Sequence, residues 1–185
     1  FLVVAPTSVV PTWASEAARF APGLRVITLG ATSAKTGRTP ADVAGDADII
    51  ITTYAVARID AARFAEVHWS ALVLDEAQFV KNPASHVHRA MLSIRADARF
   101  AVTGTPIENN LGELWALLAI VAPGLFASRR GFDETYRRPI EHGLGADRLT
   151  LLRRRLRPFL LRRTKELVAP ELPPKQEQVL TVELT

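Results

Sequence analysis

The chain has 185 residues, 48% of them hydrophobic, with a formal net charge of +4 and no cysteine. That length suits one compact domain, with or without an appendage, and the missing cysteines exclude a disulfide framework and a thiolate metal site. No apolar run approaches the ~20 residues of a membrane helix, and the first residues lack the basic stretch of a signal peptide, so we expect a cytoplasmic protein.

The first hundred residues alternate between predicted strands and helices. Short apolar runs predict strands at Leu2–Ala5, Leu24–Leu29, Ile49–Thr52, Ala71–Leu74 and Arg99–Val102. Helical spacing predicts helices at Thr12–Phe20, Ala57–Phe64 and Ala84–Ile94, with one more short helix before Ile49. This alternation predicts an α/β fold, in which helices cover both faces of a mostly parallel sheet.

After Asn110 the pattern becomes helical and rich in arginine. An apolar stripe predicts a helix from Leu111 that Pro123-Gly124 ends, and further helices are expected at Phe132–Arg138, Leu144–Leu156 and Thr164–Val168. The alternation in Gln178–Leu184 predicts a last strand that returns to the sheet. Because Trp13 and Trp115 lie on apolar helix stripes, both are predicted to be core residues.

The second half also carries most of the positive charge. Between Phe126 and Lys165 there are 12 Arg or Lys residues against 4 Asp or Glu residues. Such a region suits a polyanion such as nucleic acid. A solvated helical face is the alternative interpretation.

Two adjacent carboxylates, Asp75 and Glu76, follow the apolar run Ala71–Leu74 directly. Adjacent carboxylates are costly to bury without a compensating cation, and Mg²⁺ prefers oxygen ligands, often one or two carboxylates plus substrate phosphates. Asp75 is therefore the candidate magnesium ligand, directly or through water. Glu76 is the candidate base for the water that attacks a γ-phosphate. An Asp-Glu pair in an ordinary strand-to-helix loop is the alternative.

The next predicted strand ends at Thr103-Gly104-Thr105-Pro106, where two hydroxyls flank a glycine. Ligands of parallel α/β sheets bind beyond the carboxyl ends of the strands. We therefore expect these hydroxyls to form hydrogen bonds with the neighbouring carboxylate pair and to couple the nucleotide state to the rest of the domain. A simple turn is the alternative.

Several segments together resemble the Swi/Snf-type branch of helicase superfamily two. Asp75-Glu76-Ala77-Gln78 with Lys81-Asn82 is similar to the Asp-Glu-x-x motif of that family, and Thr103–Leu118 resembles its third motif. Three other stretches fit the same order along the chain: Val3–Ser8 with Trp13 and Glu16, Ile51–Tyr54, and Pro158–Lys165 with Leu172–Lys175. The long third-motif stretch and Leu160–Lys165 are highly specific, whereas the short Thr52–Tyr54 alone is not.

The resemblance implies the first RecA-like lobe of an ATPase that moves along double-stranded DNA, with ATP and magnesium as cofactors. It implies catalytic roles for Asp75 and Glu76, and nucleotide or lobe coupling by Gln78, Thr103, Gly104 and Thr105. A DNA-facing role is implied for Pro6, Thr7, Ser8, Thr53 and Tyr54. The expected partners are double-stranded DNA and a second RecA-like lobe of the same parent chain.

The same resemblance predicts the organisation of the chain. Residues 1–118 are expected to form the RecA-like lobe, residues 119–173 a basic helical protrusion, and residues 174–185 the returning strand that leads to the second lobe. The family's phosphate loop is expected before Phe1. We therefore expect the chain to be a segment of a longer protein that hydrolyses ATP poorly or not at all on its own, and its composition, rich in Ala and Arg, suggests a GC-rich bacterial source.

Two alternatives remain open for the function. One is a superfamily-two ATPase that acts on RNA or with RNA polymerase, although the long third motif disfavours ordinary RNA helicases. The other is a non-catalytic nucleic-acid-binding module on the same scaffold, which the intact Asp75-Glu76 pair disfavours.

One stretch, Gly30–Thr36, imitates a phosphate loop because it follows a strand and ends in Lys35-Thr36. A working loop needs G-x-x-x-x-G-K-[ST], in which the second glycine lets the backbone wrap the phosphates. Here Ala34 takes that place and the spacing is one residue short. We predict that Lys35→Ala in the intact protein leaves its ATPase rate near that of the wild type. A collapse of the rate in a steady-state ATPase assay would contradict this interpretation.

Overall fold

The computed structural model describes residues 1–105, 107, 109–143, 145–163 and 168. Within them, parallel strands form one sheet in the order β2-β3-β1-β4-β5. The strands are β1 (Leu2–Ala5), β2 (Val26–Leu29), β3 (Ile49–Thr53), β4 (His68–Asp75) and β5 (Arg95–Val102). The predicted parallel sheet is confirmed.

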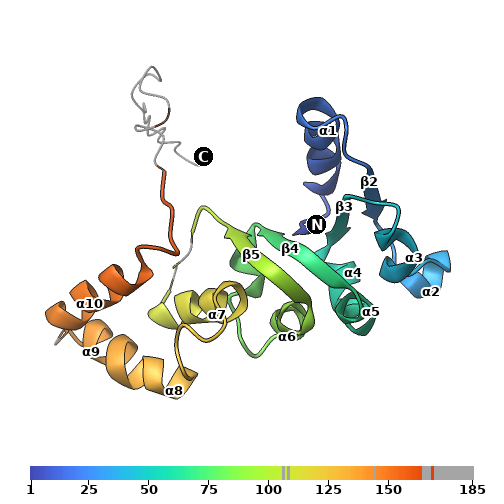
Figure 1. The fold of residues 1–185 in the computed structure, drawn as a ribbon. Helices are drawn as coiled ribbons and strands as arrows, with labels where there is room; N and C mark the ends of the chain where they lie inside the picture. Colours follow the sequence, from blue (N-terminus) through green and yellow to red (C-terminus); the bar gives the residue numbers. More distant parts are fainter. Residues whose placement is uncertain (106, 108, 144, 164–167, 169–185) are drawn as a thin grey trace, which may run out of the picture.

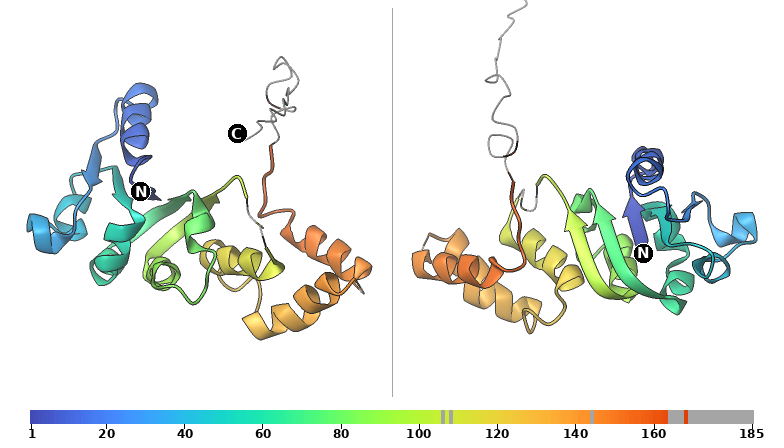
Figure 2. Two further views of the ribbon diagram at one scale, coloured as in Figure 1. Left: turned by 180° about the vertical axis from the view of Figure 1, so that it is seen from behind. Right: turned by 45° about the horizontal axis from the view of Figure 1, so that its top comes forward.

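Helices cover both faces of this sheet, as predicted (Figures 1 and 2). They are α1 (Val10–Phe20), α2 (Ser33–Thr36), α3 (Pro40–Ala44), α4 (Tyr54–Ile59), α5 (Ala61–Glu66), the 3-10 helix η1 (Ala77–Val80), α6 (His86–Ser93) and α7 (Leu111–Val121). Successive strand residues face opposite sides. Leu2 and Val4 of β1 join the large core formed with α3 to α7, whereas Val3 and Ala5 pack toward α1.

One helix and two strands differ from their predicted bounds for local reasons. The helix predicted over 57–64 is two helices that meet at Asp60, whose carboxylate accepts a buried hydrogen bond from the Ser33 backbone N–H at 2.6 Å. The strands β4 and β5 begin earlier than expected. Their first residues are polar, and His68 contacts Asp97 across the two strands at 2.8 Å. Apolar runs alone miss such exposed strand ends.

The arginine-rich part folds as a helical insertion after α7. It contains α8 (Arg129–Phe132), the π-helix η2 (Asp133–Arg137), α9 (Arg138–Glu141) and α10 (Ala146–Leu156). The single helix predicted over 132–138 is thus part of a longer run of helical segments. The helix predicted at Thr164–Val168 and the strand at Gln178–Leu184 lie outside the described residues, apart from Val168.

The insertion has its own core, which it shares with α7. Leu114 and Leu118 of α7 pack against buried side chains of α8, η2 and α10, including Phe132, Tyr136 and Leu152. The opposite side of α7 supplies Leu117 and Ile120 to the sheet core. The helix therefore runs past the predicted boundary at residue 118 and belongs to both cores.

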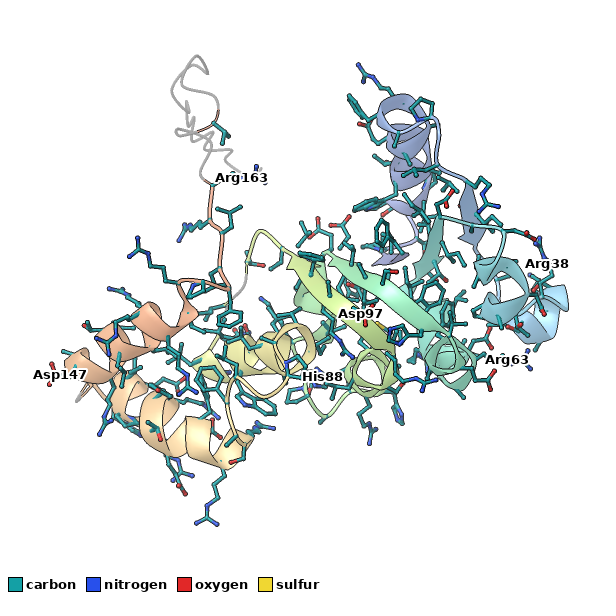
Figure 3. The ribbon with its side chains drawn as sticks, in the orientation of Figure 1. Arg38, Arg63, His88, Asp97, Asp147 and Arg163 are labelled. Atoms are coloured by element: carbon teal, nitrogen blue, oxygen red, sulfur yellow. The ribbon has the colours of Figure 1, made fainter. Side chains whose placement is uncertain are left out.

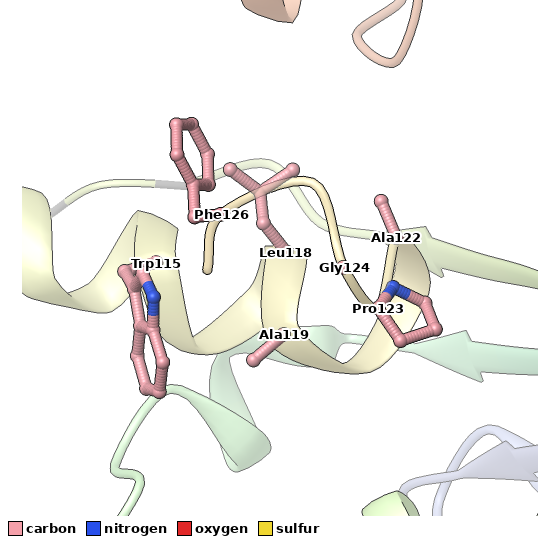
Figure 4. A pocket seen from close by; sticks show the side chains of 7 residues that line it. All are labelled: Trp115, Leu118, Ala119, Ala122, Pro123, Gly124 and Phe126. Atoms are coloured by element: carbon pink, nitrogen blue, oxygen red, sulfur yellow. The ribbon is translucent and has the colours of Figure 1, made fainter. Parts of the chain in front are cut away.

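A small apolar pocket lies where α7 ends (Figure 4). Its lining residues come from α7 and the turn after it: Trp115, Leu118, Ala119, Ala122, Pro123, Gly124 and Phe126. Trp115 is only half-buried there, so it borders the second core and does not lie inside it as predicted. The described part of the chain has no helix that is long and apolar enough to span a membrane.

Two contacts tie α7 to its surroundings at its first turn. The Lys81 ammonium lies 3.5 Å from the Glu113 carboxylate, and their side chains are only 6% and 13% exposed. From the insertion, the Glu141 carboxylate accepts a hydrogen bond from the Leu111 backbone N–H at 3.0 Å. The start of α7 is therefore held both by the segment after β4 and by α9.

We predict that Lys81→Met lowers the free energy of unfolding by about 3–5 kcal/mol, because Glu113 would keep its buried charge and lose the lysine charge beside it. The double variant Lys81→Met/Glu113→Gln removes both charges and should recover most of the loss. Urea denaturation checks both. A single variant within about 1 kcal/mol of the wild type would show that this ion pair contributes little.

His88 is buried among the helices below β4 and β5 (Figure 3), and its Nδ1 lies 2.8 Å from the Val80 carbonyl oxygen. Because a carbonyl can only accept, Nδ1 carries the proton in the neutral ring and Nε2 is unprotonated. Burial lowers the pKa of His88, and the hydrogen bond to Val80 opposes this only in part. The folded chain therefore favours the neutral ring.

This pKa direction sets a pH dependence of stability. The unfolded chain takes up a proton at His88 near its ordinary pKa of about 6.5, before the folded chain does. Stability is therefore complete above about pH 6.5 and falls as the pH drops toward the lower folded pKa. In thermal denaturation scans between pH 7.5 and 5, His88→Asn should lose less stability on acidification than the wild type. Equal losses in both proteins would exclude His88 as the cause.

Candidate active site

The parallel register collects the predicted site residues at one edge of the sheet. Ala5 pairs with Thr53, and Asp75 pairs with Val102. Residues that follow these positions, Pro6 after β1 and Thr103 after β5, therefore begin at the same edge. In this type of sheet the carboxyl edge is the usual ligand-binding side.

Asp75 is held by three groups from different parts of the chain. Its Oδ2 accepts a hydrogen bond from the Trp13 indole Nε1–H at 2.7 Å, and its Oδ1 accepts one from the Glu76 backbone N–H at 2.9 Å. Its carbonyl oxygen accepts one from the Tyr54 hydroxyl at 2.7 Å. The prediction that Trp13 is a core residue holds only in part: the half-buried ring packs against the core of Val3, Val10 and Ile51, but its polar edge reaches the carboxylate.

Glu76 has an unusual backbone conformation. Its φ of 49° and ψ of 53° make it the one described non-glycine residue with positive φ. An L-residue pays about 1–2 kcal/mol for this left-handed region, and such strain concentrates at functional sites. Asp75 ends β4 and Glu76 precedes η1, and the two adjacent carboxylates accept hydrogen bonds from different side chains, Trp13 and Gln78.

Gln78 connects Glu76 to the third motif. Its Nε2 donates to Glu76 Oε2 at 2.9 Å, and its Oε1 accepts from the Thr103 hydroxyl at 3.0 Å. The Thr103 hydroxyl oxygen in turn accepts a hydrogen bond from the Thr105 backbone N–H at 3.2 Å. We expected the threonine hydroxyls to contact the carboxylates directly. Instead, Thr103 reaches Glu76 through the side-chain amide of Gln78.

The structure gives Thr53 and Tyr54 internal roles instead of the expected DNA-facing ones. Both are buried, and the Thr53 hydroxyl accepts a hydrogen bond from the Val56 backbone N–H at the start of α4. The Tyr54 ring stacks on Phe79 with centroids 5.3 Å apart. Burial, together with the charges of Asp75 and Glu76, raises the pKa of Tyr54. Its hydroxyl therefore stays protonated and remains the donor to Asp75.

The segment after β1 has the exposure that a binding surface requires. Thr7 and Ser8 are exposed and Pro6 is half-buried, in a turn closed by hydrogen bonds from the backbone N–H groups of Val9 and Val10 to the Pro6 carbonyl oxygen. This turn leads directly into α1. Gly104, in the loop after β5, is also exposed.

The segment that imitates a phosphate loop folds differently. Residues Ser33–Thr36 form α2, which ends at Gly37 with a φ of 71°. Ser33 is buried, and its backbone N–H is committed to Asp60. The Ser33 backbone N–H is therefore not free to bind a phosphate.

Across the described residues, no group of three or more His, Cys, Asp or Glu side chains is placed to hold a metal ion. Two residues of this site were not predicted, Trp13 as a partner of Asp75 and Phe79 as the stacking partner of Tyr54. The position of a tryptophan on an apolar helix stripe does not indicate which acceptor its indole N–H will contact. Phe79, however, directly follows Gln78 in the sequence, and an apolar residue beside a motif is a reasonable candidate for a site contact. In the structure its side chain is 54% exposed.

Comparisons with known proteins agree with this architecture. A family model described as SNF2-related domain matches residues 1–185. The transcription regulatory protein SNF2 of Saccharomyces cerevisiae is 36% identical over 198 residues, covering 100% of this chain and 12% of that protein. The putative ATP-dependent helicase/translocase YwqA of Bacillus subtilis is 37% identical over 179 residues, covering 96% of this chain and 19% of that protein.

A solved structure gives the same result for the fold. The SWI2/SNF2 ATPase core of Sulfolobus solfataricus, in complex with dsDNA, matches with a TM-score of 0.77 and 38% identity. The match covers 89% of this chain and 33% of that one, so this chain spans only a minor part of its relatives. The expected RecA-like α/β fold and the expected family are both confirmed, and the chain belongs to the SNF2-related domain family.

Proposed function

We propose that the protein containing this chain hydrolyses ATP to move along double-stranded DNA, with this chain as most of its first ATPase lobe. The observation that carries the proposal is the linked set Asp75, Glu76, Gln78 and Thr103 at the carboxyl edge of the sheet. Family membership supports the ATPase activity, and the DNA-bound SWI2/SNF2 ATPase core supports the DNA partner.

The donor set at Asp75 fits magnesium. Each carboxylate oxygen has two lone pairs, and Trp13 and the Glu76 backbone N–H each occupy one on a different oxygen. Both oxygens therefore keep a lone pair for the ion or for one of its waters. The remaining ligands would be water and substrate phosphates, the usual arrangement for magnesium. When bound, the ion neutralises negative charge on the phosphate oxygens.

Glu76 is the proposed base. Its carboxylate can take a proton from a water that attacks the γ-phosphate, and the Gln78 amide holds its Oε2. Because Gln78 also accepts from Thr103, a change at Glu76 alters the hydrogen bonds of the loop after β5. We propose this connection as the route by which Thr103, Gly104 and Thr105 couple hydrolysis to movement.

Pro6, Thr7 and Ser8 are the proposed DNA-facing residues. Exposed hydroxyls and backbone N–H groups can contact phosphates, which positions a protein on DNA without reading its sequence. The buried side chains of Thr53 and Tyr54 are left out of this surface. Their part is to set the start of α4 and the position of Asp75.

The basic insertion supports a nucleic-acid partner. Arg153, Arg154, Arg155 and Arg157 are exposed at the end of α10, and Arg155 also donates to the Leu125 carbonyl oxygen and lies over the Phe126 ring. Figure 3 places Arg163 on the segment that rises from α10, and Figure 1 shows α1 and this segment on opposite sides of the ends of β4 and β5. The exposed arginines are therefore the ones available to phosphates.

The rest of the active site would come from other parts of the parent protein. The 185 residues contain no G-x-x-x-x-G-K-[ST] motif. An arginine from a facing lobe is worth about 10³–10⁵ in rate in related phosphoryl transfers. The isolated chain should therefore hydrolyse ATP slowly or not at all, even with DNA present.

We predict that Glu76→Gln in the intact protein lowers the DNA-stimulated ATPase rate by about 10²–10⁴, the range for loss of a general base. ATP and DNA binding should be kept, because the amide is isosteric. The matched control is Glu66→Gln, the same change on an exposed residue that precedes the other end of β4. Steady-state ATPase assays with duplex DNA, single-stranded DNA and RNA give the measurement.

Each outcome has a clear meaning. Loss of activity in Glu76→Gln alone, with stimulation by duplex DNA, supports the proposal. Stimulation by RNA in place of DNA would favour an RNA-directed ATPase. An unchanged rate in Glu76→Gln, with nucleic-acid binding intact, would favour a non-catalytic binding module.

A further inference from the structure

We propose that Trp13 is a positioning residue for the magnesium carboxylate Asp75, and that it links the turn after β1 to this carboxylate. The inference rests on the function proposed above. Its basis is one contact: the Trp13 indole N–H donates to Asp75 Oδ2 at 2.7 Å, from a residue 62 positions earlier in the chain. A hydrogen bond to a carboxylate at this distance is of the strong, charge-assisted kind.

This contact fixes the plane of the carboxylate. Asp75 Oδ1 is already held by the backbone N–H of the next residue, so a second donor on Oδ2 prevents rotation about the Cβ–Cγ bond. Tyr54 holds the carbonyl oxygen of the same residue. With the backbone and both oxygens held, the remaining lone pairs keep one direction. Groups that orient a metal ligand in this way typically change metal affinity or activity 10–100-fold when they are removed.

Trp13 also has a short, rigid connection to the exposed turn. The Trp13 backbone N–H donates to the Val9 carbonyl oxygen, and the Val9 backbone N–H donates to the Pro6 carbonyl oxygen. Thr7 and Ser8 lie inside this hydrogen-bonded turn and are exposed. A polyanion that contacts them therefore acts on the same helical turn that carries the donor to Asp75.

A purely structural role for the ring makes a different prediction. Trp13 packs beside the small core of Val3, Val10 and Ile51. Trp13→Phe keeps an aromatic ring for this packing but removes the N–H. The chain supplies two matched controls, because Trp69 donates its indole N–H to the Phe64 carbonyl oxygen and Trp115 borders the insertion core, so neither contacts Asp75.

The first experiment observes the hydrogen bond without turnover. In the intact protein labelled with ¹⁵N-tryptophan, Trp13→Phe identifies the Trp13 indole signal by its loss. Asp75→Ala removes the acceptor, so the Trp13 signal should move upfield while those of Trp69 and Trp115 stay in place. Addition of Mg²⁺ with a non-hydrolysable ATP analogue should move the same signal. A Trp13 signal that ignores Asp75→Ala would overturn the proposal.

The second experiment measures how the loss of the Trp13 hydrogen bond affects the Mg²⁺ dependence of the ATPase activity and its stimulation by DNA. In Trp13→Phe, the Mg²⁺ concentration for half-maximal ATPase activity should rise on the order of tenfold, and the stimulation by duplex DNA should fall. The KM for ATP at saturating Mg²⁺ should change little, and Trp115→Phe should behave like the wild type. An unaltered Mg²⁺ dependence in Trp13→Phe would contradict the proposal.

The two sets of experiments separate the hypotheses. If Glu76→Gln keeps full ATPase activity, the proposed function fails, and the indole signal still reports whether Trp13 holds Asp75. If Glu76→Gln is inactive but Trp13→Phe has wild-type Mg²⁺ and DNA dependence, the function stands and the role of Trp13 is refuted.

Discussion

The parallel pairing of β4 with β5, with Asp75 opposite Val102, is the constraint on which the rest of the site depends. It starts the loop after β5 beside the carboxylate pair, within reach of one glutamine side chain. A slip of one residue would turn the side chains of the moved strand to the other face of the sheet. Because buried apolar residues of β4 resist this, the hydrophobic core also fixes the polar contacts between Gln78 and Thr103.

The sequence allowed prediction of the elements whose signal is local. Apolar runs located the strands, and the position of Asp75 at a strand end followed from four preceding apolar residues. Contacts between distant residues could not be predicted, because no local pattern shows which donor will reach a carboxylate. Trp13 was assigned to the core from its helix stripe, and the amide of Gln78 between Glu76 and Thr103 was missed for the same reason.

The left-handed conformation of Glu76 also has no sequence signal, since nothing about a glutamate announces a positive φ. The packing of the elements on either side offsets the energetic cost of this conformation. Asp75 belongs to a strand with neighbours on both edges, and η1 buries Ala77 and Val80 in the main core. The carboxylate pair thus lies on a short segment whose geometry is fixed by the elements on both sides. Rigid elements of this kind hold a site more accurately than a free loop does.

The sharing of α7 between two cores restricts which substitutions this chain can accept in that helix. A helix that supplies Leu117 and Ile120 to the sheet core and Leu114 and Leu118 to the insertion core must fit both partners. The insertion therefore cannot unfold while α7 remains intact without exposing apolar side chains to water. Nor can it be exchanged for another module without refitting α7, so lobe and insertion are expected to evolve as one unit.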